Sequence, residues 1–351
     1  MSPPTLGVVV VAFNAEDVIL DCLESLLASQ GTALRIIVVD NASTDDTVST
    51  IHDWAAGDAI YAAASDLPFA VQPYPKPVLL TGGITSVDGP CHTVRLIATG
   101  INAGFAAGVN RGLQELASCA DVDRFWILNP DSVVAPETAA AFATQPVTPA
   151  GFALMGGRVL YLETPDKIQI DGGTINEKTG VTGNIGLAAS ASATPCPMPS
   201  DIHFITGASM VASRRFYEIA GPMPEDYFLY YEEVDWALRR GNLPLVYCAG
   251  GIVYHRAGTA IGSPTLGRPA SPFSLYFKHR GRLRFMRRHF PRNLPYAYAY
   301  SLAKALQLLL KGYPEEARTI LGASFDWKPS ASIRARLGPE AARLAFRKDA
   351  G

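Results

Sequence analysis

The first half of the chain alternates between short apolar runs and segments in which apolar residues recur at helical spacing. Three of the runs are rich in β-branched or aromatic residues and end in polar turns: Leu6–Phe13, Leu34–Asp40 and Phe125–Leu128. Such runs are typical of strands that are buried on both faces of a parallel sheet. Residues 18–27 place leucines at the spacing of an amphipathic helix. This order predicts an α/β fold with a mostly parallel, Rossmann-like sheet flanked by helices.

The rest of the pattern extends this sheet and then changes character. We expect strands at 94–98, 153–160, 204–212, 245–248 and 251–255, helices at 47–54, 102–117 and 214–219, and an irregular hairpin at 163–186. Residues 57–92 are rich in Ala, Pro and Gly without a sustained period, so we interpret them as a surface insertion. The pattern predicts an α/β domain over 1–270, including this insertion, and a helical C-terminal extension over 271–351.

Asn129-Pro130-Asp131 directly follows the buried run at 125–128. Pro130 has no N–H for a strand ladder, so the chain leaves the sheet there. In open α/β sheets, ligands bind at the carboxyl ends of strands, where Asn129 and Asp131 lie. A carboxylate in that place offers a hard oxygen to a divalent cation that also holds phosphates. The alternative is an ordinary turn, because all three residues are turn formers.

A second informative stretch joins aromatic residues to acids. Residues 227–231 hold four aromatic side chains, and Glu232, Glu233 and Asp235 follow. Adjacent like charges and burial beside aromatic rings raise the pKa of a carboxyl group, as a general base near neutral pH requires. The acids could also favour the first turn of a helix through its dipole, and both effects can hold together. Asp235 and Arg239 are spaced i,i+4, which predicts a structural ion pair.

Two further segments follow predicted strand ends. Residues 102–113 space glycines through a helix start, which allows close backbone approach to an anionic ligand. Tight packing of the helix on the sheet would explain the same glycines. His255 ends the run at 251–255. A lone histidine is usually a satisfied surface or core residue, but imidazole is also a competent ligand for Mn²⁺-type metals beside oxygen donors.

Composition narrows the class of protein without pointing to a partner. The chain has 351 residues, 48% of them hydrophobic and 18% charged, and a net charge of −2, so a globular enzyme without bias toward nucleic acid is expected. Its five cysteines form no Cys-x-x-Cys pair, which argues against a zinc site or a disulfide framework and suits the reducing cytoplasm. We expect neither a signal peptide nor a membrane span, because the most apolar stretch, 294–310, contains Lys304 and Gln307.

Together these segments resemble the inverting family 2 glycosyltransferases with a GT-A fold, most closely the rhamnosyltransferase-like group. The matching pieces are collinear over roughly residues 6–290: 8–14, 38–45, 102–110, 128–131, 207–208, 228–239 and 254–255. Each piece is common by itself, whereas the ordered set is specific.

The resemblance implies a role for each matching position. It assigns nucleotide-sugar binding to Ala12, Phe13, Asn14, Asp40, Asn102, Gly104, Phe105, Asn110, Asn129 and Asp131. Asn129 replaces the first Asp of the family's Asp-x-Asp motif, so Asp131 is the main carboxylate for a Mn²⁺ or Mg²⁺ ion, with His255 as a further metal ligand. The catalytic base is implied to lie in the pair Glu232 and Glu233, and within that pair to be Glu233.

The implied reaction transfers a sugar, with rhamnose favoured, from a nucleotide-diphosphate donor such as dTDP-L-rhamnose. The acceptor would be a hydroxyl of a saccharide or lipid-linked glycan in cell-surface polysaccharide synthesis. Glu233 would take the proton of that hydroxyl, which attacks the anomeric carbon from the opposite face and inverts its configuration. The cation would neutralise the leaving diphosphate.

The C-terminal extension is basic as well as helical. Residues 273–292 carry seven Lys or Arg residues and no acid, and four leucines continue an amphipathic pattern as far as residue 310. One interpretation is a solvated basic helix. The other is a peripheral contact of residues 273–310 with anionic lipid or a lipid-linked diphosphate acceptor, on the inner face of the cell membrane.

Two functions from other classes stay open. A nucleotidyltransferase that makes sugar nucleotides would need a glycine-rich, basic loop after the first strand, where this chain has Phe13–Asp17 without a glycine or a base. A non-catalytic nucleotide-sugar-binding module would lose the acids, whereas Asp131, Glu232 and Glu233 are present.

Overall fold

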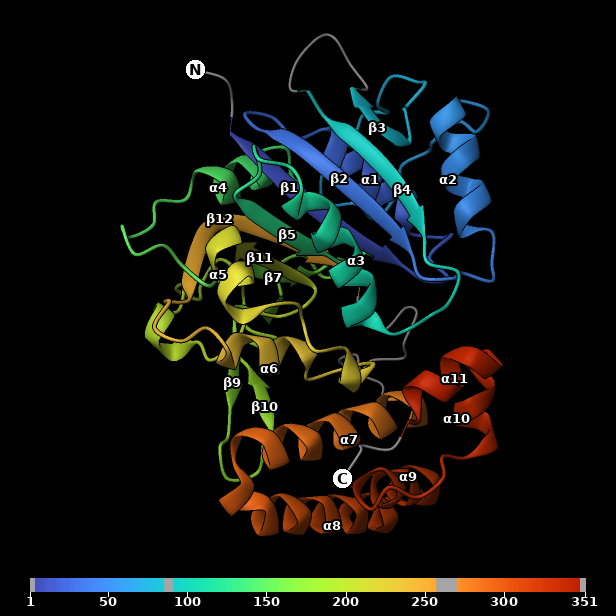
Figure 1. Cartoon of the computed structure of the whole chain (residues 1–351), viewed down its shortest axis with the longest axis vertical. Coiled ribbons are helices and arrows are strands. Elements are labelled where there is room, and N and C mark those ends of the chain that lie inside the picture. Colours follow the sequence, from blue (N-terminus) through green and yellow to red (C-terminus); the bar gives the residue numbers. More distant parts are fainter. Residues whose placement is uncertain (1–3, 85–90, 257–269, 348–351) are drawn as a thin grey trace.

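The computed structural model describes residues 4–84, 91–256 and 270–347, and its N-terminal half follows the expected alternation of strand and helix. The elements are β1 (Thr5–Ala12), α1 (Ile19–Leu27), β2 (Ala33–Asp40), α2 (Thr47–Ala56), β3 (Thr81–Ile84), β4 (Thr93–Ala98), α3 (Phe105–Ala117) and β5 (Arg124–Leu128). Strands β4, β2, β1 and β5 lie side by side and are all parallel. The apolar runs therefore form the parallel part of the sheet, as predicted (Figure 1).

The second half of the sheet is mixed. Its elements are β6 (Ser132–Val134), α4 (Thr138–Thr144), β7 (Leu154–Tyr161), β8 (Ile168–Ile170), β9 (Gly173–Ile175), β10 (Thr182–Asn184), β11 (Ser209–Ser213), α5 (Arg214–Ala220), α6 (Glu232–Leu238) and β12 (Val246–His255). Strand β11 is antiparallel to β5 and β7, while β12 is parallel to β7 and antiparallel to β6. The two strands expected at 245–248 and 251–255 are one strand, whose register shifts between Tyr247 and Ile252. Strands β9 and β10 form a hairpin within 163–186.

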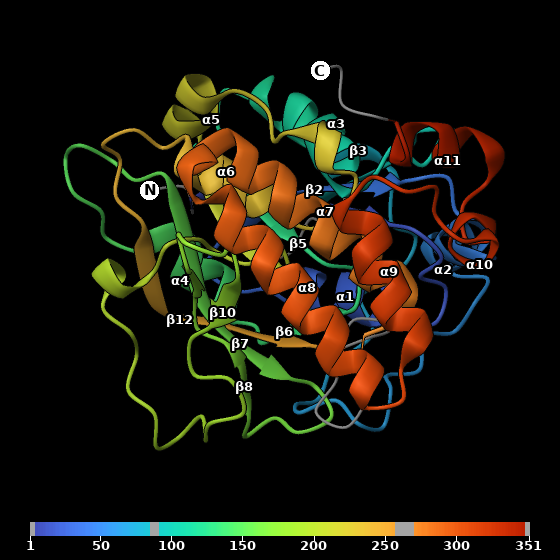
Figure 2. The same cartoon turned by 90° about the horizontal axis from the view of Figure 1, so that it is seen from below.

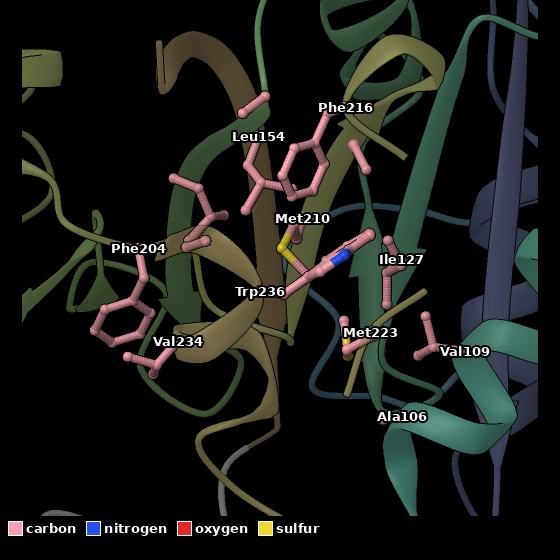
Figure 3. Packing of buried hydrophobic residues seen from close by; sticks show 14 of the residues in the cluster. Ala106, Val109, Ile127, Leu154, Phe204, Met210, Phe216, Met223, Val234 and Trp236 are labelled. Carbon is pink, nitrogen blue, oxygen red and sulfur yellow. The ribbon is translucent and has the colours of Figure 1, made fainter. Parts of the chain in front are cut away.

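The strand β1 shows why the central run had to be continuously apolar. Successive side chains of a strand point to opposite faces of the sheet. Val8 and Val10 pack with α1, α2 and α4, whereas Val9 and Val11 pack with α3, α5 and α6. On the second face Trp236 of α6 is fully buried, with its ring centroid 4.8 Å from that of Phe216 (Figure 3). Both faces of the sheet are therefore covered by helices.

The segment interpreted as an insertion is tied to the fold. Strand β3 pairs with β4, and three side chains between α2 and β3 are buried: Tyr61, Val71 and Val78. The fully buried carboxylate of Glu24 on α1 accepts hydrogen bonds from the Tyr74 backbone N–H at 2.6 Å and from Lys76 Nζ at 2.7 Å. Part of 57–92 is thus buried against α1, which differs from a purely surface insertion. Residues 85–90 of that segment, and 257–269 of the expected α/β domain, lie outside the described residues.

The C-terminal extension is helical, with its last residues, 348–351, outside the described part. It comprises α7 (Pro272–His289), α8 (Leu294–Leu310), α9 (Pro314–Ser324), α10 (Ala331–Ala335) and α11 (Pro339–Ala345). Helices α7, α8 and α9 pack side by side beneath α6 and the β9–β10 hairpin (Figures 1 and 2). No helix in the described part of the chain is both long and apolar enough to cross a membrane.

Three of the five arginines of α7 point inward, against the interpretation of a solvated basic helix. Arg280, Arg282 and Arg284 are only 7%, 2% and 7% exposed. Arg280 donates to the carbonyl of Ala345 at 2.5 Å, and Arg282 donates to the carbonyl of Ala297 at 3.1 Å. These guanidinium groups join the C-terminal helices to one another instead of facing solvent.

Candidate functional site

A cavity of about 270 Å³ lies at the carboxyl ends of β1, β2 and β5. Seven of the ten residues expected to bind a nucleotide sugar line it: Phe13, Asn14, Asn102, Gly104, Phe105, Asn129 and Asp131. They come together because the ends of parallel strands meet at one edge of a sheet. We refer to this space below as the donor cavity, after the prediction that these residues bind a nucleotide-sugar donor.

The loops after β1 and β2 are joined at the cavity by hydrogen bonds. The backbone N–H of Asn14 donates to Ser43 Oγ at 3.0 Å, and Asn14 Oδ1 accepts from the Thr44 N–H at 2.8 Å. Asn41 Nδ2 donates to Asn102 Oδ1 at 3.1 Å and to the Gly104 carbonyl at 3.0 Å. The amide side chains therefore fix the shape of the rim.

Three of the ten expected residues do not line the cavity. Ala12 is fully buried in β1, and Asp40 is buried with its Oδ1 accepting from the Ser43 N–H at 3.2 Å. Asn110 Nδ2 donates to the carbonyl of Met223 at 2.8 Å, and its Oδ1 accepts from the Met223 N–H at 2.8 Å. The Asn110 amide thus fastens α3 to the loop before α6 and lies outside the lining of the cavity.

Asp131 and His255 meet at the floor of the cavity. Strand β12 pairs with β6, and this register sets His255 opposite Ser132, the residue after Asp131. His255 Nε2 lies 3.1 Å from Asp131 Oδ1 and 3.1 Å from Asn129 Nδ2. Burial alone would lower the pKa of His255, but the neighbouring carboxylate of Asp131 outweighs it and raises that pKa above its usual value.

The other ring nitrogen of His255 is held by a residue that the sequence did not single out. His255 Nδ1 lies 2.8 Å from Gln169 Oε1 of β8. The amide oxygen can only accept, so Nδ1 carries a proton in this pair. Next to the Asp131 carboxylate, Nε2 favours a proton as well, and a cation bound between the two groups would take the place of that proton. Metal-ligating histidines are commonly oriented by a second partner of this kind.

These donors fit a divalent cation that shares its coordination with phosphates. Asp131 offers a carboxylate oxygen and His255 an imidazole nitrogen, the donor types that suit Mn²⁺. Within 4–84, 91–256 and 270–347, no cluster of three or more His, Cys, Asp or Glu residues could hold a metal. Further coordination positions would therefore come from a bound diphosphate and water. Asn129 in place of an aspartate removes one negative charge from this set.

The two acids expected to include the base have different surroundings. Glu232 is buried, at 2% exposure, whereas Glu233 lines a second recess of about 140 Å³. Lys278 of α7, Thr206 and Tyr231 line the same recess. Phe228 and Leu229 line the donor cavity, so the loop 228–231 borders both spaces. Of the pair, Glu233 is the acid that a molecule in the recess can reach.

The environment of Glu233 suits a proton acceptor. Burial raises the pKa of Glu233 to about 7. Hydrogen bonds from backbone N–H groups at the start of α6 and the positive charge of Lys278 limit this rise. Desolvation by the surrounding protein lowers the pKa of the Lys278 amine, although part of the side chain is exposed to solvent in the recess. Burial and the charge of Glu233 raise the pKa of Glu232 well above its usual range. Each charge therefore disfavours the other, and the pair favours a single negative charge.

Asp235 is structural, and its predicted pairing is confirmed. Its Oδ1 lies 2.7 Å from Arg239 Nε, and its Oδ2 accepts from Tyr227 Oη at 2.7 Å and from Arg288 Nη1 at 2.5 Å. Burial would raise the pKa of Asp235, but hydrogen bonds from these three residues and His289 outweigh it and hold the pKa well below its usual range. The carboxylate joins α6 to α7.

The loop that leads to the acids has an unusual backbone. Phe228, Tyr230 and Tyr231 have φ values of 65°, 65° and 77°, which residues with a side chain rarely adopt. The Phe105 N–H donates to the Phe228 carbonyl at 3.0 Å, and a Cβ at Gly104 would lie 2.4 Å from that oxygen. On the other side, a Cβ at Gly281 of α7 would lie 2.7 Å from the Tyr230 carbonyl. The loop is therefore clamped between α3 and α7, and each clamp requires a glycine.

The sequence pattern missed several residues that line the two spaces. They are Asn41 and Phe228 beside the donor cavity, Lys278 in the recess, and Phe273, Arg336 and Leu337 from the C-terminal extension. Asn41 was visible as part of the turn after β2. The others depend on the docking of α7 and α10 against the loop 228–231, which no local pattern indicates.

Known proteins support the fold assignment. Residues 7–63, which span β1 to the segment after α2, match the family model for Glycosyl transferase family 2. No curated protein matches the chain significantly. The mannosyltransferase PcManGT from Pyrobaculum calidifontis, solved in complex with GDP-Man and Mn²⁺, is similar with a TM-score of 0.51 and 14% identity over 93% of this chain and 87% of its own.

GalNAc-T7, solved with UDP, GalNAc and Mn²⁺, is similar with a TM-score of 0.55 and 12% identity over 90% of this chain. The match covers 55% of the GalNAc-T7 chain, so this chain spans about half the length of that protein. The chain therefore has the GT-A fold of glycosyltransferases, which is a mixed and largely parallel sheet flanked by helices, with further helices at the C-terminus. The match to the family 2 model lies within its first 63 residues.

Proposed function

We propose that this protein is an inverting glycosyltransferase that moves a sugar from a nucleotide-diphosphate donor to a hydroxyl group. The observation that supports it most strongly is the accessible acid Glu233, whose pKa is raised to about 7, in a recess beside the cavity at the ends of β1, β2 and β5. Two spaces bordered by one loop, with a proton acceptor in one of them, suit a displacement between two bound substrates. The neighbours solved with GDP-Man or UDP and Mn²⁺ have the same fold.

Different residues of the chain have different roles in this reaction. Phe13, Asn14, Asn102 and their neighbours on the rim hold the nucleotide, while Glu233 accepts the proton of the acceptor hydroxyl. Asp131 and His255 hold a Mn²⁺ or Mg²⁺ ion that, when bound, neutralises the leaving diphosphate. The acceptor oxygen attacks from the recess, on the side away from the diphosphate, so the anomeric configuration inverts.

We propose dTDP-L-rhamnose as the favoured donor, on the strength of the rhamnosyltransferase-like sequence pattern that includes Asn129-Pro130-Asp131. The test is thermal stabilisation by dTDP-L-rhamnose, UDP-glucose, UDP-N-acetylglucosamine and GDP-mannose, each with Mn²⁺. The dTDP sugar should stabilise the protein most. A larger shift with a UDP or GDP sugar would replace the donor but keep the enzyme class, and no shift with any of them would contradict the proposed function.

We further propose that the acceptor is a saccharide or lipid-linked glycan reached at the inner face of the cell membrane through residues 273–310. Support comes from α8, which contains no acidic residue and whose outer face exposes Tyr296, Leu302, Leu306, Leu309 and Leu310. Such a face suits the headgroup region of a bilayer. Free thiols at all five cysteines suit the cytoplasm.

The membrane contact has its own test. Sedimentation with phosphatidylglycerol vesicles should recover the wild-type protein, and Leu306→Glu should abolish recovery. Leu187→Glu, at an equally exposed leucine outside the extension, is the matched control and should behave as wild type. Equal recovery of the Leu306 and Leu187 variants would contradict the contact.

A further inference from the structure

The wall of the donor cavity is completed by the C-terminal extension. Phe273 of α7, together with Arg336 and Leu337 after α10, lines the same cavity as Asn14, Asn102 and Asp131. Residues more than 200 positions apart in the sequence thus face one space. The extension is part of the site that we assign to the donor.

Packing on both sides fixes the position of Arg336. Leu337 follows it directly, is buried, and packs in one apolar cluster with Phe228, Leu229 and Phe273. Ile333, one turn earlier in α10, is 2% exposed and belongs to the same cluster. The backbone around Arg336 is therefore anchored to the loop 228–231, which borders the cavity.

The extension is also tied down beyond Arg336. Ala341 and Ala345 of α11 lie in that apolar cluster, and Arg280 of α7 donates to the carbonyl of Ala345 at 2.5 Å. A carbonyl at the C-terminal end of a helix is a favourable partner for a cation. The segment after Arg336 is thus held by α7, whose Phe273 ring lies 5.1 Å from the Arg336 guanidinium carbon. This contact with the ring face orients the side chain at the cavity wall.

The charges of the residues that line the cavity indicate which group of a ligand Arg336 would bind. Among the described residues that line the cavity, Arg336 is the sole Lys or Arg and Asp131 the sole carboxylate. A nucleotide-diphosphate sugar brings negative charge on both phosphates, and Asp131 adds more. With Asn129 where a second aspartate would strengthen metal binding, a protein cation gains importance for holding the diphosphate.

We propose that Arg336, supplied by the C-terminal extension, binds the diphosphate group of the nucleotide-sugar donor. The assignment rests on the proposed function, because it takes the cavity to be the donor site. A guanidinium group matches phosphate oxygens in a bidentate geometry that the ammonium of lysine does not reproduce. The extension then joins donor binding to the position of the loop 228–231 and of Glu233.

The experiment compares diphosphates with nucleosides. Calorimetric titration with dTDP, UDP and GDP, and with thymidine, uridine and guanosine, is carried out in EDTA and again with Mn²⁺. Arg336→Gln should weaken binding of the preferred nucleoside diphosphate by about 10- to 100-fold, as expected for the loss of a charged hydrogen-bonding group. Binding of the matching nucleoside should be unchanged, and the loss should be larger in EDTA. Arg334→Gln, at an exposed arginine of α10 that does not line the cavity, is the matched control and should bind as wild type.

Each outcome has a distinct meaning. Equal diphosphate binding by wild type and Arg336→Gln overturns the role of Arg336 while leaving the proposed function in place. Equal weakening of nucleoside and diphosphate overturns it as well, because that pattern is a packing defect beside Phe273. Absence of nucleotide binding by the wild type overturns the proposed function together with this assignment. If Arg336→Gln lowers the melting temperature, Arg336→Lys replaces it, and several-fold weaker diphosphate binding by that variant supports the bidentate contact.

Discussion

His255 Nδ1 lies 2.8 Å from Gln169 Oε1, while His255 Nε2 lies 3.1 Å from Asp131 Oδ1. The amide oxygen of Gln169 therefore holds the proton on Nδ1, so that Nε2 is the ring nitrogen that would bind a cation together with the carboxylate. We expect Gln169→Ala to weaken Mn²⁺ binding in the presence of dTDP by about 10- to 100-fold, the usual effect of losing such an orienting partner. Electron paramagnetic resonance of free Mn²⁺ measures this without any assay of transfer.

Gln30→Ala, at an exposed glutamine that follows α1 and does not line the donor cavity, is the control for that measurement. It should leave Mn²⁺ affinity unchanged. Identical affinities of the Gln169 variant and the wild type would mean that Gln169 does not orient a metal ligand.

Asp131→Ala tests the cation more directly. The change removes the sole carboxylate among the described residues that line the donor cavity. Transfer should be lost in this variant, while its circular dichroism stays that of the wild type. In the wild type, EDTA should abolish transfer and Mn²⁺ or Mg²⁺ should restore it. Full turnover in EDTA would contradict the role given to Asp131 and His255.

Lys278 should set the pH dependence of the reaction. The pKa of Glu233 is about 7, and the positive charge of Lys278 lowers it. A base must be deprotonated to act, so kcat/KM should rise as the pH increases through that value. Lys278→Met removes the charge, raises the pKa of Glu233 and should move the acid limb of the profile to higher pH. Lys328→Met, at an exposed lysine of the extension, should leave the limb in place, and an unmoved limb in the Lys278 variant would contradict the coupling.

Asp235→Asn should act on stability. The side chain of Asp235 is fully buried and accepts from Tyr227, Arg239 and Arg288. Removing one partner of a buried charge network lowers the free energy of unfolding by about 3 kcal/mol. Asp226→Asn is the control, because Asp226 pairs with the same Arg288 but is 46% exposed, and it should cost less than about 1 kcal/mol. Urea unfolding measures both, and equal losses would contradict the assignment.

The same carboxylate gives a pH signature. The folded-state pKa of Asp235 is depressed, so its contribution is present above the unfolded value of about 4 and is lost as the pH falls through the folded value. Wild-type stability should therefore fall more steeply below about pH 4 than that of Asp235→Asn. Parallel acid unfolding curves of the two proteins would show that Asp235 has no such coupling.

Local sequence patterns were sufficient for the first half of the fold. The runs that form β1, β2 and β5 are continuously apolar because each strand is covered on both faces. Asp235 pairs with Arg239 because the two residues are one helical turn apart. Those relations involve neighbours in the sequence. The turn at Asn129–Asp131 was predictable for the same reason, since Pro130 must end the strand.

Long-range register decided what the sequence could not show. Gln169 and His255 are 86 residues apart and meet only because β7 pairs with both β8 and β12. The arginines of α7 look like a solvated basic face in the sequence, because nothing local shows that the carbonyls of Ala297 and Ala345 will face them. Asn110 matched a ligand position but is used by the backbone of Met223. The residue type alone did not show which hydrogen-bond partner its side chain would have in the folded protein.

The most direct test of the account is turnover by Glu233→Gln beside Glu232→Gln, with donor affinity measured separately. Glutamine keeps the volume of the side chain but cannot accept the proton, so Glu233→Gln should lower kcat by about 10²- to 10⁴-fold with donor affinity unchanged. Glu232→Gln should lose far less, because Glu232 is buried and does not line the recess. Full turnover by Glu233→Gln, whether or not Glu232→Gln is inactive, would contradict the assignment of Glu233 as the catalytic base.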